Sequence, residues 1–188
     1  MNIIEKTYLK TPRSIFFLFM VFSPMIIYIF LENVFNSSET LGPLIISIIY
    51  LGWFYVLGTN LYDKVSGKIK LSKSIFEFNI LYSILFITTM LFLVEFKLVS
   101  NISGTNPFIF PFAFYNLIAL AYTIYFIAKA LSYFTYNDAS DKHGITGIMS
   151  LLFLFPIGII VLQPKINRIF KNDWGIIFNY ITSWYLND

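Results

Sequence analysis

Among the charged side chains that lie within long apolar stretches of the sequence, the first candidates for chemistry are Glu77, Glu95 and Lys129. An unpaired charge is costly in lipid, so such residues mark ion paths or proton relays unless they have a structural partner. Glu77 and Lys129 are expected at similar depth near helix ends, where they could pair with each other. Their long side chains could equally extend to the headgroups, which is the simpler explanation. Glu95 is expected deeper and is the best single candidate for a functional charge, with a structural partner on another helix as the alternative.

Polar residues in the fourth apolar segment are spaced so that they share helix faces. One face carries Asn116, Ala119, Thr123 and Ala130, and a second stripe carries Tyr115, Tyr122, Tyr125 and Lys129. Small and polar residues allow helices to approach closely and to form hydrogen bonds in lipid, so ordinary packing explains both faces. The functional alternative is that these residues line a polar path.

The single histidine, His143, lies near Asp138 and Asp141 in a short connection. Such residues can bind zinc or act as acid and base. One histidine in a chain with no cysteine is poor material for a metal site, and Asp141 before Gly144 is better explained as a helix cap. We therefore predict no metal and no cofactor, and the absence of cysteine also excludes disulfides and thiolate nucleophiles.

The composition of the chain indicates whether these residues lie in a water-soluble protein or in a membrane protein. The chain is 57% hydrophobic and 12% charged, too apolar for a water-soluble enzyme of this size. The sequence contains no phosphate-binding loop, nucleophile elbow or metalloprotease motif, so we expect no enzymatic activity. The excess of basic residues lies beside apolar runs, which favours membrane orientation over direct binding of nucleic acid.

Five apolar segments are long enough, or nearly so, to cross a hydrocarbon layer of about 30 Å. They cover residues 14–31, 41–59, 76–100, 107–133 and 145–163. They are too uniformly apolar for barrel strands, and backbone groups in lipid must be paired within each segment. The sequence predicts an all-α, polytopic membrane bundle that forms one domain over residues 1–188. Residues 171–188 mix aromatic and polar residues, which predicts an interfacial amphipathic helix, with a tail packed on the bundle as the alternative.

Lysine and arginine predict the orientation, because short basic loops stay in the cytoplasm. The N-terminal tail is basic, and so is the connection over 60–75, which contains Lys64, Lys68, Lys70 and Lys73. We therefore expect a cytoplasmic N-terminus. The abundance of isoleucine, phenylalanine and asparagine with little alanine is typical of AT-rich genomes, which suggests a bacterial inner membrane.

The fifth segment, 145–163, leaves two topologies open. Its length favours a full crossing, which would place Lys165, Arg168 and Lys171 outside. A re-entrant helix, giving four full spans, would keep these residues in the cytoplasm, and Pro156 could break the helix. We expect the full crossing on length.

The function that we expect is a non-enzymatic, self-associating channel, pore or membrane-permeability effector, because a bundle this small rarely encloses a path alone. The alternative is an accessory or regulatory membrane partner whose basic loop and tail bind a soluble complex or anionic lipid. In size and number of spans the chain is similar to membrane accessory proteins of bacterial antiviral systems, including those beside RNA-targeting CRISPR effectors. That layout implies a partner in antiviral defence. A transporter is less favoured, because the sequence lacks an internal repeat and paired carboxylates.

Overall fold

The computed structural model describes residues 22, 25–26, 28–30, 41–66, 68–95, 109–136, 142–154 and 158–170. These residues form helices and short connections, and none of them belongs to a strand, so the all-α prediction is confirmed for this part of the chain. The described residues of the first predicted segment are helical; the rest of that segment and the predicted interfacial tail, 171–188, lie outside the described residues.

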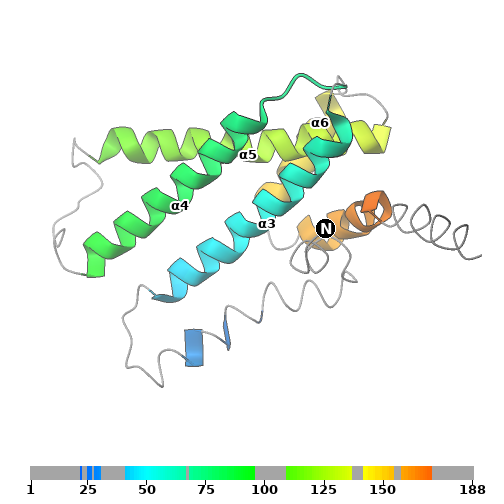
Figure 1. Ribbon diagram of the computed structural model, residues 1–188. Helices are drawn as coiled ribbons and strands as arrows, with labels where there is room; N and C mark the ends of the chain where they lie inside the picture. Colours follow the sequence, from blue (N-terminus) through cyan, green and yellow to red (C-terminus); the bar gives the residue numbers. More distant parts are fainter. Residues whose placement is uncertain are drawn as a thin grey trace, which may run out of the picture.

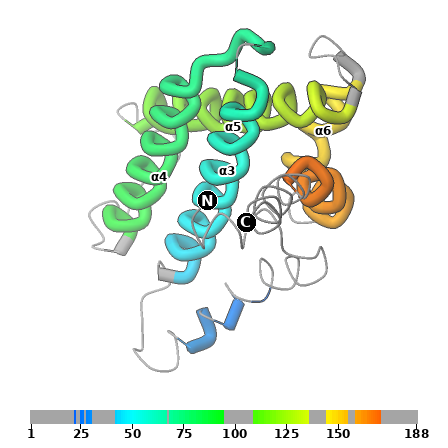
Figure 2. Tube along the Cα trace, turned by 45° about the vertical axis from the view of Figure 1, so that its right-hand side comes forward, coloured from blue at the N-terminus to red at the C-terminus, as the bar shows by residue number. Residues whose placement is uncertain are grey.

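Three of the described helices are long and apolar enough to cross a membrane. They are α3 (Leu41–Val65), α4 (Lys73–Glu95) and α5 (Phe110–Tyr136). Figures 1 and 2 show α3 and α4 side by side, with α5 crossing both obliquely. The three helices coincide with the second, third and fourth predicted segments, and they fit an integral membrane protein.

Large apolar side chains remain exposed on the outer faces of α4 and α5. Examples are Leu81, Leu85, Phe92, Phe110, Phe114 and Leu117. In water such faces would favour aggregation, whereas lipid tails solvate them without cost. The exposure pattern therefore agrees with helices that face lipid.

The helix ends differ from the predicted segment ends because a helix does not stop where its apolar residues stop. α3 continues past Thr59 to Val65, where the backbone turns and the Lys68 amide donates to the Val65 carbonyl at 2.9 Å. α4 begins at Lys73, and the Ile75 amide donates to the Ser72 hydroxyl at 3.4 Å. Serine at this position caps a helix by pairing an amide that has no partner within the helix.

The core contains an aromatic cluster where α3, α4 and α5 meet. The rings of Phe76 and Phe126 stack with centroids 4.2 Å apart, and Tyr62 lies 5.9 Å from Phe126. Gly58 on α3 makes this packing possible, because a Cβ atom there would overlap the Phe76 ring. Gly52, two helical turns earlier, has no neighbouring atom that a Cβ would contact.

These two glycines predict opposite effects of the same substitution. Gly58→Ala should lower the free energy of unfolding by about 1–2 kcal/mol, because overpacking against Phe76 outweighs the gain in helix propensity. Gly52→Ala, the matched control, should raise the free energy of unfolding by up to about 1 kcal/mol. Thermal melting of the detergent-solubilised variants, followed by circular dichroism, measures both. A stabilised Gly58→Ala protein would contradict the packing of Phe76 on α3.

The predicted fifth segment is not one continuous helix in the structure. α6 (Lys142–Phe153) ends before a turn at Leu154, and a separate helix covers residues 158–170. The chain changes direction between them (Figure 1), and Gly158 lies so close to α6 that a Cβ atom would overlap the Leu151 carbonyl oxygen. Only glycine accommodates such an approach of two backbone segments.

The neighbours of each helix show where along the bundle this break lies. Met149 and Phe153 of α6 border a cavity of about 510 Å³ together with Leu51 of α3 and Leu120 of α5, residues midway along those helices. In contrast, the helix over 158–170 leads to Phe170, which lies beside Lys64 at the end of α3. The pair therefore runs from mid-bundle back to the end that carries the α3–α4 connection.

Candidate functional site

The polar sides of α4 and α5 face each other within the protein. The Tyr115 hydroxyl donates to Asn79 Oδ1 at 3.0 Å, and the Tyr82 hydroxyl donates to the Phe112 carbonyl at 3.0 Å. The two tyrosine rings meet edge to face, with centroids 4.6 Å apart. Helix-to-helix hydrogen bonds of this kind stabilise packing in lipid.

The two candidate residues on the first polar face of α5 are buried. Asn116 is 8% exposed and Thr123 is 1% exposed. The Thr123 hydroxyl donates to the Ala119 carbonyl of its own helix at 2.9 Å, and Asn116 Oδ1 has no hydrogen-bond partner among the described residues. Both side chains therefore lie inside the protein. They could line a polar path only if they were exposed, and in this packing they are not.

The second candidate stripe on α5 is only partly buried. Lys129 Nζ lies 5.5 Å from the ring centroid of Tyr125, within the range of a cation–π contact. The Tyr122 ring is 6.3 Å from Phe126 and so joins the aromatic cluster. No ion pair joins Lys129 to Glu77 in the part of the chain that the structure describes.

Glu77 borders a cavity of about 410 Å³ between α3 and α4. Tyr55 of α3 and Leu81 of α4 also line this cavity. Glu95 is the last residue of α4, and its side chain is outside the described part of the chain. Of the two glutamate candidates, Glu77 is therefore the one that the structure places at a cavity.

The connection that contains the single histidine lies largely outside the described residues. His143 lies in α6, but its side chain is not described, and Asp138 and Asp141 lie outside the described residues. Among the described residues, no group of three histidine, cysteine or carboxylate side chains could hold a metal ion.

One end of the bundle gathers basic residues from two distant parts of the chain, and we call it the basic end. It comprises Lys64, Lys68, Lys70 and Lys73 around the α3–α4 connection, with Lys165 and Arg168 from the helix over 158–170. Lys64 Nζ lies 5.2 Å from the Phe170 ring centroid, and Lys68 Nζ lies 5.5 Å from that of Tyr133. These contacts join α3, α5 and the last described helix at one end.

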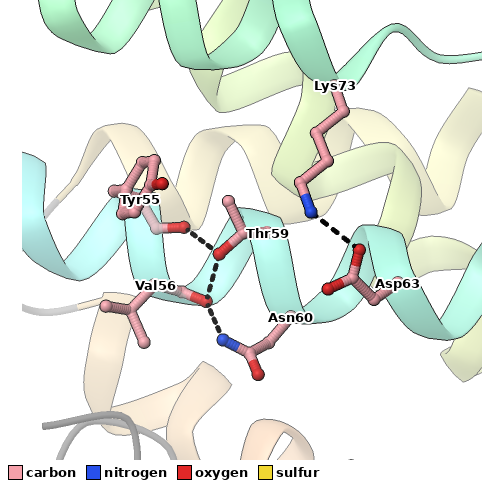
Figure 3. Close-up of polar contacts among 6 residues, drawn as sticks. All are labelled: Tyr55, Val56, Thr59, Asn60, Asp63 and Lys73. Carbon is pink, nitrogen blue, oxygen red and sulfur yellow. Dashed lines mark hydrogen bonds and ion pairs between the residues drawn. The ribbon is translucent and has the colours of Figure 1, made fainter. Parts of the chain in front are cut away.

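Lys73 is partly neutralised within this end. Its Nζ donates to Asp63 Oδ1 at 2.9 Å (Figure 3), and the two side chains are 35% and 62% exposed. An ion pair this exposed is worth at most about 1 kcal/mol, but it fixes the α3–α4 connection and removes one cation from the free charge. Thr59 and Asn60 nearby bond only to carbonyls of α3, at 2.8 Å each (Figure 3), in the contacts that the structure describes.

A cavity of about 540 Å³ opens at the basic end. It is lined by Phe134 and Thr135 of α5 and by Lys165, Arg168 and Ile169. From the sequence, Lys165 and Arg168 were expected as part of a basic tail that follows the fifth segment, without a cavity between them. The positive charge after the fifth segment was the only feature of the sequence that pointed to these residues. The cavity itself depends on how the helix over 158–170 packs, which hydropathy does not predict.

Comparison of the chain with protein-family models, with curated proteins and with solved structures finds no match. The geometry of the basic end and of the α4–α5 contact must therefore support any functional conclusion.

Proposed function

We propose that this is a non-enzymatic, integral membrane accessory protein that presents a cationic cytoplasmic face to an acidic soluble partner. The observation that supports it best is the basic end, where lysines of the α3–α4 connection meet Lys165 and Arg168. Clustered positive charge accelerates and selects association with acidic surfaces. The similarity in layout to membrane accessory proteins of antiviral systems makes a bacterial defence complex the first partner class to test.

A re-entrant fifth segment is part of this proposal. α6 and the helix over 158–170 have 12 and about 13 residues, so each spans only about 20 Å and is too short to cross alone. Their return to the end beside Lys64 would keep Lys165 and Arg168 on the side of the α3–α4 connection, as the distribution of basic residues favours. Together with a crossing by the first predicted segment, the proposal has four crossings and a cytoplasmic N-terminus in the bacterial inner membrane.

Charge reversal at the exposed part of the connection tests the docking. Tagged protein is purified from its native membrane after cross-linking, and co-purifying soluble proteins are compared between the wild type and Lys68→Glu/Lys70→Glu. We expect acidic soluble proteins to be depleted at least tenfold in the variant. Lys129→Gln, which removes a cation that is not one of the six residues of the basic end, should leave them unchanged. Equal recovery in all three proteins would contradict the proposal.

A self-associating channel is the second candidate, and the position of Glu77 favours it. A carboxylate in a cavity between α3 and α4 lies where a second copy could complete a polar path, and exposed apolar faces on α4 leave room for contact. Ion flux into liposomes tests this candidate, with Glu77→Gln, Glu95→Gln and Lys129→Met as variants. Tight vesicles at high protein density would contradict it.

A further inference from the structure

The cavity at the basic end combines cationic and apolar walls. Lys165 and Arg168 lie one helical turn apart and line it together, while Phe134 and Ile169 supply apolar surface. Neither Lys165 nor Arg168 forms an ion pair with any residue that the structure describes. The Thr135 hydroxyl also borders the cavity, and it donates to the Leu131 carbonyl at 3.0 Å.

Two further cations lie just outside these walls. Lys64 lies over Phe170, the residue after Ile169, and Lys68 lies over Tyr133, the residue before Phe134. Helix carboxyl ends carry a partial negative charge of roughly −0.5 each, so the three helices that meet here contribute at most about −1.5. Lys68, Lys165 and Arg168 alone supply three full positive charges, which exceed this, and Asp63 is already bound to Lys73. The cavity therefore retains a positive field.

The cavity also lies at the level where headgroups would be. Thr135 is the last residue of the apolar part of α5, which could cross a membrane from Phe110 to Thr135. A phosphate at this level would meet the cations, and the attached glycerol would meet Phe134 and Ile169. A volume of about 540 Å³ is in the usual range for bound organic molecules and far exceeds what a bare phosphate ion needs.

We infer that this cavity binds the phosphate group of an anionic phospholipid. Arg168 supplies a planar pair of donors to the phosphate oxygens, Lys165 acts as a second, mobile charge, and Phe134 and Ile169 contact the start of the lipid tails. The inference goes beyond the docking proposed above, because it assigns a lipid phosphate to Lys165 and Arg168, whereas the docking is tested at Lys68 and Lys70.

Native mass spectrometry of the full chain in detergent tests the site. The protein is titrated with phosphatidylglycerol, with phosphatidylcholine, and with inorganic phosphate as a competitor. The wild type should bind phosphatidylglycerol at least tenfold more tightly than phosphatidylcholine. Arg168→Gln should lower phosphatidylglycerol affinity about tenfold, as expected for the loss of one charge-assisted pair of hydrogen bonds. Arg168→Lys should retain part of the affinity, because the charge remains.

Lys70→Gln is the matched control, since it removes one exposed cation of the basic end that does not line the cavity. It should change the affinity less than twofold. Equal losses in Arg168→Gln and Lys70→Gln would show diffuse attraction and overturn the site, as would equal affinity for the two lipids. Displacement of phosphatidylglycerol by inorganic phosphate at similar concentrations would overturn the assignment to a lipid. Melting curves of each variant confirm that the compared proteins are folded.

Discussion

Phe126→Ala is expected to lower the free energy of unfolding by on the order of 3 kcal/mol, the largest loss that we expect from one substitution in the core. Phe126 is 0% exposed, and its ring stacks on Phe76 and lies near Tyr62. Lipid tails are as apolar as the core, so little is lost by transfer alone. The cost comes from the cavity, because the surrounding rings lose their contact atoms and relax only partly.

Phe114→Ala on the same helix is the matched control. Phe114 is 55% exposed, so the same chemical change removes contacts with lipid and leaves the free energy of unfolding nearly unchanged. Thermal melting in detergent distinguishes the two variants. Equal melting temperatures for Phe126→Ala and Phe114→Ala would contradict the assignment of Phe126 to the junction of α3, α4 and α5.

Gly158→Ala should give the second largest effect, about 2–3 kcal/mol of lost stability. A Cβ atom at Gly158 would overlap the Leu151 carbonyl oxygen, and backbone cannot move aside as a flexible side chain can. The helix over 158–170 must then shift away from α6, which would also separate Phe170 from Lys64. The loss therefore reports on the turn between the two helices.

Gly147→Ala in α6 provides the comparison, because a Cβ atom there has no neighbour within contact distance. It should be neutral or stabilising by up to about 1 kcal/mol through helix propensity. Melting curves and protection from limited proteolysis near residue 170 measure both variants. A Gly158→Ala protein as stable as Gly147→Ala would be incompatible with the close approach of Gly158 to Leu151.

Hydropathy predicted the helices that became α3, α4 and α5, because a long apolar run in lipid has few alternatives to a helix. It predicted the ends less well. The third predicted segment begins at residue 76, whereas α4 begins at Lys73. Asp63 and the Ser72 cap stabilise the first turn of α4, and these contacts depend on the fold.

The polar faces of α5 could be predicted from the sequence, but which of them would be buried could not. Helical spacing shows that Asn116 and Thr123 share a face, yet only the packing of α5 against its neighbours shows that this face is buried. Similarly, Pro156 indicated a possible break in the fifth segment. Length alone favoured one crossing, since average hydropathy does not record whether a helix is continuous.

The most direct test asks whether the α3–α4 connection and the helix over 158–170 lie on the same side of the membrane. The chain has no cysteine, so single-cysteine variants need no further change. We predict that a membrane-impermeant maleimide labels Lys70→Cys and Lys165→Cys only in inverted vesicles. It should label Ser103→Cys in intact cells, because residue 103 lies between the third and fourth predicted segments, on the side opposite to the 60–75 connection. Labelling of Lys165→Cys in intact cells, with Lys70→Cys protected, would show a full fifth crossing and contradict the basic end as a cytoplasmic docking face.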